Sequence, residues 1–187
     1  CLVGSEMCIR DRNNRQITAR QIQTGEVSML AGGVRIQGAD LQEIAKIRTW
    51  QELLFPLHGK VEREYTAEAA AQTVWNTEVM ELLQSLHEEK GAFLFRIEYK
   101  GSLDERKKSE FVKKTASLLE EKSERMLINS ISDYEIEIRI VESKKGGYLP
   151  FLRLYTMEDE RFVYRKESIA ASIAPVNAAP VSYTHLR

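Results

Sequence analysis

The sequence predicts an α+β fold in which helices flank a small mixed sheet. Two segments repeat apolar residues at three- and four-residue steps, which is typical of amphipathic helices. Two others alternate apolar and charged residues, which is typical of half-buried strands. A Gly-Gly turn joins the last alternating segment to a further apolar run. The expected order from residue 66 is therefore helix, strand, helix, strand, strand.

The two predicted helices cover residues 66–90 and 102–125. In the first, Thr66 is a candidate N-cap and the apolar stripe is Ala71, Val74, Trp75, Val79, Leu82, Leu83 and Leu86. In the second, Ser102 is the candidate N-cap and Glu105 completes a capping box.

The predicted strands include one over residues 92–100 and a hairpin over residues 134–155. In the hairpin, Tyr134, Ile136, Ile138 and Ile140 share one side of an extended chain. The turn at residues 144–147 ends in Gly146-Gly147, and residues 148–155 form the returning strand.

The segment before residue 60 gives weaker signals. Residues 13–37 suggest a small β-rich unit, and residues 40–46 suggest a short helix capped by Asp40. Residues 47–57 fit either a helix that starts with a capping box at Thr49 or a buried strand that ends at Pro56.

Bulk properties exclude several classes of protein. The chain has 187 residues and a formal net charge of −1, so a polyanion would have to bind a local patch rather than a global positive field. No apolar run approaches the roughly 20 residues that span a bilayer. Cys1 and Cys8 form no disulfide framework, which favours a cytoplasmic location. His58 and His87 lie far apart, and the sequence predicts neither a catalytic group nor a metal site.

Cations cluster on the second predicted helix. A spacing of seven places Arg106 over Lys113 and Lys107 over Lys114, on one helical face. Such a stripe suits phosphate contacts. A solvated helix surface explains it equally simply, and both interpretations stay open.

Cations next to aromatic residues form a second group near the end of the chain. Arg153 alternates with Phe151 and Tyr155, a pattern that can stack bases and neutralise phosphates, or pair with Glu137 across the sheet. Arg161, Tyr164, Arg165 and Lys166 follow and also suit RNA, because arginine binds phosphate bidentately. The alternative is that Phe162 and Tyr164 pin the linker, while Arg161 and Arg165 bridge to Asp159 or Glu160.

Asn129 lies at the start of a predicted strand. Its side chain could contact an RNA backbone or a ribose, or it could cap a turn.

Several of these segments together resemble a known family. Residues 127–130, 133–139, 151–156, 161–166 and 171–179 look like the THUMP domain of bacterial THUMP-containing RNA methyltransferases and the connector to their catalytic domain. The match covers about residues 62–179. The preceding segment resembles the end of the ferredoxin-like subdomain that accompanies THUMP in that family.

The resemblance implies a domain organisation. Residues 13–60 would be a partial N-terminal ferredoxin-like subdomain, residues 61–160 a THUMP-like RNA-binding domain, and residues 161–180 a connector toward a missing methyltransferase domain. Residues 1–12 and 181–187 resemble translated sequencing-adapter read-through. We set them aside as non-native.

The same resemblance implies a function. The chain would dock structured RNA, either the acceptor end of tRNA or a segment of rRNA, with no membrane partner and no DNA specificity. It would not be an enzyme by itself and would hold no cofactor; S-adenosylmethionine would belong to the missing methyltransferase domain. The residues expected to contact RNA are Arg106, Lys107, Lys113, Lys114, Asn129, Arg153, Arg161, Tyr164, Arg165 and Lys166.

Two alternatives stay open. THUMP domains also serve RNA thiolation, pseudouridine formation and acetylation, so the missing domain could differ. The near-neutral charge and the 28 acidic residues also fit an α+β protein-interaction domain with no RNA role.

Overall fold

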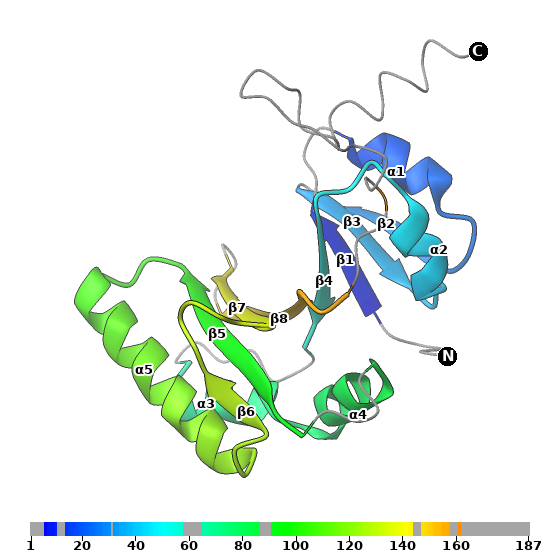
Figure 1. Ribbon diagram of the computed structural model, residues 1–187. Coiled ribbons are helices and arrows are strands. Elements are labelled where there is room, and N and C mark those ends of the chain that lie inside the picture. Colours follow the sequence, from blue (N-terminus) through cyan, green and yellow to red (C-terminus); the bar gives the residue numbers. More distant parts are fainter. Residues whose placement is uncertain are drawn as a thin grey trace, which may run out of the picture. The chain divides into compact units, whose positions relative to one another are not determined.

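The computed structural model describes residues 6–10, 14–30, 32–57, 65–86, 91–143, 147–157 and 161 (Figure 1). The chain divides into two compact units, each described here by itself. Unit 1 consists of Cys1–Phe55 and Met157–Arg187, and unit 2 consists of Pro56–Thr156. The segment that follows the hairpin therefore belongs with the N-terminal unit.

Unit 1 contains an antiparallel sheet and two short helices. Its elements are β1 (Glu6–Arg10), α1 (Arg15–Gln21), β2 (Glu26–Leu30), β3 (Gly33–Gln37), α2 (Leu41–Lys46) and β4 (Glu52–Pro56). The strands lie in the order β2-β3-β1-β4, and each neighbouring pair is antiparallel. The succession strand, helix, strand, strand, helix, strand is that of the ferredoxin-like motif.

The first strand corrects an expectation from the sequence. Residues 1–12 were set aside from the fold, yet Glu6–Arg10 forms β1 between β3 and β4. Ile9 is fully buried there. Strand β1 therefore belongs to the strand order β2-β3-β1-β4 of unit 1, whereas the predicted subdomain began at residue 13.

Helix α1 replaces the β structure expected between residues 13 and 37. No side chain caps it, and β-branched Ile17 and Thr18 lower its intrinsic helix propensity, so the sequence carries little helix signal. Tertiary packing stabilises it instead: Thr18 is buried, and its hydroxyl lies 2.7 Å from that of Thr49.

The remaining predictions for unit 1 resolve clearly. Asp40 caps α2, and its carboxylate accepts a hydrogen bond from the Gln42 N–H at 2.9 Å. Residues 47–57 fitted either a helix or a strand in the sequence, and they contain strand β4, in which Leu53, Leu54 and Phe55 are all buried.

Unit 2 has the predicted α+β architecture. Its elements are α3 (Ala67–Val74), α4 (Thr77–Leu86), β5 (Phe93–Lys100), α5 (Glu105–Lys122), β6 (Leu127–Asn129), β7 (Ile136–Glu142) and β8 (Tyr148–Leu154). Strands lie in the order β8-β7-β5-β6; β5 is parallel to β6 and β7, whereas β7 and β8 form the predicted hairpin. The α+β class with a mixed sheet flanked by helices is confirmed.

One face of this sheet is apolar and the other is charged. Phe93, Phe95, Ile136 and Ile138 are fully buried on the apolar face. Helices α3 and α5 run along the sheet in Figure 1 and contact each other. Strand alternation then places Arg96, Glu98, Glu137, Arg139 and Arg153 on the opposite face.

The predicted helix over residues 66–90 is two helices. Thr66 caps α3 as expected, but the backbone of Trp75 turns extended (φ −97°, ψ 95°). The Asn76 side chain then accepts a hydrogen bond from the Val79 N–H at 3.1 Å and donates one to the Thr73 carbonyl at 2.8 Å. Apolar periodicity continues through this break, which is why it predicted one helix.

Helix α5 starts two residues later than predicted. The Asp104 carboxylate, rather than the Ser102 hydroxyl, caps it by accepting from the Lys107 N–H at 2.9 Å. Ser102 instead donates from its N–H and its hydroxyl to the Glu142 carboxylate. The predicted capping box at Ser102 is therefore wrong.

Replacing Asp104 with alanine is expected to destabilise the protein, because it removes the N-cap of an 18-residue helix. Urea unfolding followed by circular dichroism measures the change. Ser102→Ala is the matched control and should cost less, since its partner Glu142 is bound at an exposed position. If Ser102→Ala destabilised the protein more than Asp104→Ala, Ser102 would be the N-cap, as the sequence predicted.

Candidate nucleic-acid interface

The cations of α5 separate into two groups in the structure. Arg106 and Lys113 lie on one side of the helix, and Lys114 lies on another, where its Nζ is 2.6 Å from the Glu68 carboxylate of α3. Arg106 is 89% exposed and pairs with Glu110 at 3.3 Å. Lys107 pairs with Asp104 at 3.6 Å. Three of the four predicted phosphate contacts therefore already have carboxylate neighbours.

Lys113 differs from the other three because it lines an open pocket of about 410 Å³. Within the described parts of the chain, its side chain has no carboxylate partner. The pocket exists because β6 is only three residues long, so β5 has no β6 neighbour beyond Phe95. Side chains from α5 and from the turn after β6 surround this gap.

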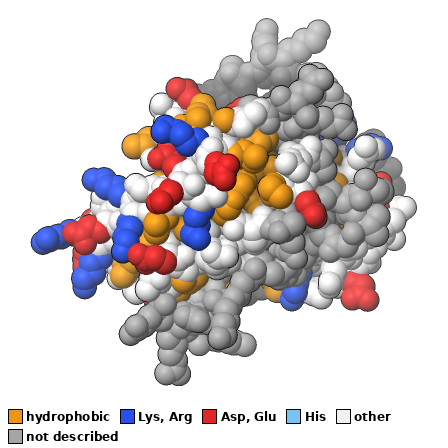
Figure 2. Space-filling view, turned by 90° about the horizontal axis from the view of Figure 1, so that it is seen from below, with side chains coloured by type: hydrophobic (Ala, Val, Ile, Leu, Met, Phe, Trp, Pro, Cys, Tyr) orange, Lys and Arg blue, Asp and Glu red, His pale blue; other side chains and the backbone are white. Residues whose placement is uncertain are grey.

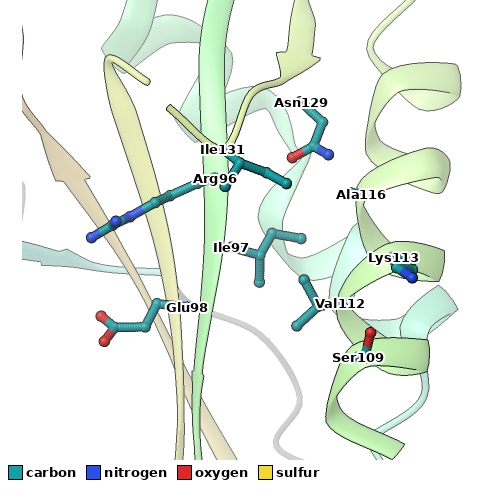
Figure 3. Close-up of a pocket in the computed structure, with 9 residues that line it drawn as sticks. All are labelled: Arg96, Ile97, Glu98, Ser109, Val112, Lys113, Ala116, Asn129 and Ile131. Carbon is teal, nitrogen blue, oxygen red and sulfur yellow. The ribbon is translucent and has the colours of Figure 1, made fainter. Parts of the chain in front are cut away.

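The pocket combines polar and apolar groups (Figure 3). Ile97 of β5 points toward Val112 of α5, whereas the charged end of Arg96 points away from the helix. Ile131, after β6, is 86% exposed. The remaining lining residues are Glu98 of β5, Ser109, Lys113 and Ala116 of α5, and Asn129 of β6.

Asn129 lies where the sequence predicted a site residue. Its backbone N–H donates to the Glu120 carboxylate at 2.8 Å, which fixes the end of β6. Its side chain is exposed and lines the pocket together with Lys113 (Figure 3). A cation, an amide and a hydroxyl above an apolar floor can contact a phosphate, a ribose or the edge of a base.

Arg153 lies on the other face of the sheet. Its strand neighbour is Glu137, as the pairing interpretation expected. The guanidinium of Arg153 lies over the ring of Tyr155, 4.5 Å from its centroid. Arg153 is therefore on a surface distinct from the α5 pocket.

Glu137 is the centre of a buried charge cluster. It is 0% exposed and accepts hydrogen bonds from Arg96 Nε at 3.1 Å, from Arg139 Nε at 2.8 Å and from the Tyr155 hydroxyl at 3.1 Å. Burial raises the pKa of its carboxyl, but the hydrogen bonds from Arg96 and Arg139 outweigh burial and lower that pKa to about 2. Glu137 therefore stays ionised.

Arg161 lies in unit 1 and is only 8% exposed. Its guanidinium lies 3.4 Å from the centre of the Trp50 ring and donates to the carbonyls of Ile47 at 3.2 Å and Trp50 at 3.0 Å. These contacts hold Arg161 within unit 1, so we leave Arg161 out of the candidate interface. Tyr164, Arg165 and Lys166 lie outside the described residues.

Those predicted cations that the structure describes do not gather on one surface. Arg106 and Lys113 lie on α5, Arg153 lies on the charged face of the sheet, and Arg161 is buried in unit 1. Among the residues coloured in Figure 2, Lys and Arg side chains are interspersed with Asp and Glu rather than gathered in one block.

Other kinds of site receive no support from the described ranges. Within them, no group of three or more His, Cys, Asp or Glu side chains is placed to hold a metal ion. None of the helices found there combines the length and apolar character that crossing a bilayer requires.

Solved structures resemble this chain even though no protein-family model and no curated protein matches its sequence. TrmN from Thermus thermophilus aligns with a TM-score of 0.64 and 14% identity over 97% of this chain and 54% of its own. A predicted N6-adenine-specific DNA methylase from Listeria monocytogenes gives 0.60 and 15% over 96% and 48%. A 4-thiouridine synthetase in complex with RNA and ATP gives 0.50 and 13% over 80% and 41%.

The chain shares their fold. At these identities the likeness establishes the architecture alone, and it is consistent with the THUMP-like domain expected from the sequence. The chain spans about half the length of these proteins.

Two residues of the charged sheet face were absent from the predicted interface, Arg96 and Tyr134, and Tyr155 was named only as an aromatic neighbour of Arg153. Tyr134 was assigned to the apolar side of its strand, whereas its ring packs against Tyr155 and under Arg96. The alternating pattern contained Arg96, but its contact with Glu137 depends on the register between β5 and β7. Register between distant strands leaves no local trace in the sequence.

Proposed function

We propose that this chain is the RNA-recognition module of an RNA-modifying enzyme. The observation that carries the proposal is the fold, which is shared over most of the chain with TrmN and with a 4-thiouridine synthetase whose structure contains RNA. The pocket beside α5 supplies groups that suit a sugar–phosphate backbone.

Methylation is the modification that we favour. Two proteins named as methylases align at TM-scores of 0.60 and 0.59, against 0.50 for the thiouridine synthetase. In this proposal a separate domain binds S-adenosylmethionine in the cytoplasm, while the present chain selects a structured RNA such as the tRNA acceptor end or rRNA. Thiolation is the closest alternative within the same class.

Lys113 and Asn129 would make the central contacts. Of the four predicted cations on α5, the other three pair with carboxylates, and Lys113 lines the pocket instead. The Asn129 amide lines the same pocket. Arg106 would add a flanking phosphate contact one turn before Ser109, since its ion pair with Glu110 is exposed and therefore weak.

A salt titration of RNA binding tests this proposal. Affinity for a hairpin RNA, measured by fluorescence anisotropy, should fall linearly on a log–log plot as salt rises. Lys113→Ala should reduce the magnitude of that slope by about one and weaken binding about tenfold at 0.1 M salt, because one phosphate contact is lost.

The control for Lys113 is Lys122, which lies in the last turn of the same helix and binds the Gln72 side chain at 2.9 Å. Lys122→Ala should leave the slope unchanged. A DNA hairpin of the same sequence should bind more weakly, since A-form shape and 2′-hydroxyls would be missing. A chain with no RNA affinity at low salt, or with equal affinity for DNA, would contradict the proposal.

A protein-interaction module is the second candidate, and one observation favours it. The cations that sequence patterns assigned to RNA lie on separate surfaces, and three of the four on α5 have carboxylate partners. Absence of salt-dependent RNA binding in the same titration would support this candidate.

A further inference from the structure

The charged face of unit 2 carries a row in which two aromatic rings lie between two guanidinium groups. Arg96 lies 3.9 Å from the centre of the Tyr134 ring. Tyr134 meets Tyr155 edge-to-face with centroids 5.2 Å apart, and Arg153 lies 4.5 Å from the centre of the Tyr155 ring. We call these four residues the stacking row.

The stacking row is held rigidly from beneath by Glu137. The carboxylate binds Arg96 at one end and the Tyr155 hydroxyl near the other, so both side chains are fixed by one buried group. The backbone adds a further restraint, because the Tyr155 N–H donates to the Glu135 carbonyl at 2.8 Å. A preorganised surface loses little conformational entropy when a ligand binds.

The outer end of the row is accessible. Tyr155 is 40% exposed, and Arg153 beside it is partly exposed. An aromatic ring backed against a guanidinium plane is the combination on which unpaired bases stack in proteins that bind single-stranded RNA. Its two arginines also suit the adjoining phosphates.

From this geometry we propose that the Arg153–Tyr155 pair is a stacking site for an unpaired RNA base. The pair is separate from the pocket beside α5, because neither Arg153 nor Tyr155 lines that pocket, although Arg96 at the other end of the row does. The inference rests on the proposed RNA-binding function and deepens it. The partner would be structured RNA that carries a single-stranded segment, rather than a continuous duplex.

The test compares two RNAs that differ only in their bases. One is a hairpin with a short single-stranded overhang, and the other has the same overhang made of abasic sugar–phosphate units. Both overhangs carry the same charge, so a difference in affinity reports base stacking rather than phosphate contacts. The wild-type chain should bind the overhang with bases about 5- to 150-fold more tightly, which corresponds to stacking of one base.

Three variants then assign the effect to the pair. Tyr155→Leu and Arg153→Lys should bind both RNAs with the affinity that the wild-type chain has for the abasic RNA. Tyr155→Phe should keep most of the preference for the overhang with bases, because it keeps the ring and loses only the hydroxyl bond to Glu137 that restrains the ring. Circular dichroism of each variant verifies that the sheet is folded.

Each outcome decides a separate point. If the wild-type chain binds both RNAs equally, the stacking site is disproved while RNA recognition stands. If Tyr155→Phe loses as much as Tyr155→Leu, the hydroxyl–Glu137 bond is what matters and the ring does not bind a base. If the chain binds neither RNA, the proposed function fails together with the site.

Discussion

Glu137→Gln is expected to destabilise the protein by about 3 to 5 kcal/mol at neutral pH, the range for breaking a buried ion pair on one side. The glutamine has nearly the same shape, so packing is preserved. It removes the negative charge that Arg139 and Arg96 share, and Arg139 is itself buried. Urea unfolding measured by circular dichroism gives the difference in free energy.

Glu142→Gln is the matched control on the same strand. Its carboxylate accepts from the Ser102 N–H and hydroxyl near the surface, so we expect a much smaller cost than for Glu137→Gln. If the two variants lost equal stability, the cluster around Glu137 would not be the electrostatic centre of unit 2.

The effect of Glu137→Gln should also depend on pH. The folded-state pKa of Glu137 is lowered to about 2 from an ordinary value of 4.5. A lowered carboxyl pKa contributes stability that is fully present above about pH 4.5 and is lost as the pH falls toward 2. The stability difference between the wild type and the variant should therefore shrink across that window. A difference that stays constant down to pH 2 would contradict the assignment.

Arg161→Ala is the second change with a large expected effect. It leaves the carbonyls of Ile47 and Trp50 without their donor and removes the cation from the Trp50 ring, so unit 1 should lose about 2 to 4 kcal/mol. Trp50 reports the change by fluorescence when Trp75 is replaced by phenylalanine. Arg161→Lys should be intermediate, because a lysine keeps the charge but lacks the planar fork.

Arg20→Ala is the control for Arg161, since Arg20 is exposed in the last turn of α1 in the same unit. Its expected cost is within about 0.5 kcal/mol. If Arg161→Ala were as stable as the wild type but bound RNA more weakly, Arg161 would be an RNA-contacting residue, as the sequence predicted. A destabilised variant would establish that Arg161 stabilises unit 1 through its contacts with Ile47 and Trp50, between α2 and β4.

Much of the fold could be read from local patterns. Alternation located β5 and the β7–β8 hairpin, and a Thr or Asp before an apolar repeat located α3 and α2. Helix α1 and strand β1 were missed for different reasons. The first has little intrinsic helix preference and depends on the buried Thr18–Thr49 contact, and the second lies in a terminal segment that the sequence analysis set aside.

The candidate site could be predicted only in part. Lys113 and Asn129 were both named in advance, but their meeting in one pocket depends on how far β6 extends along β5. The seven-residue spacing predicted that Lys114 lies on the same helical face as Lys107. Only the packing of α5 against α3 revealed that Lys114 pairs with Glu68.

By itself the sequence determined the α+β class, the hairpin and the cationic character of α5, because periodicity, turn residues and charge act over a few neighbouring residues. Only the tertiary structure decided what the cations do. It buries Arg161 on Trp50, joins Arg96 to Glu137 across 41 residues of chain and sets Arg153 on Tyr155. An arginine has the same charge in each setting, and its burial and neighbours decide whether it stabilises the fold or meets a ligand.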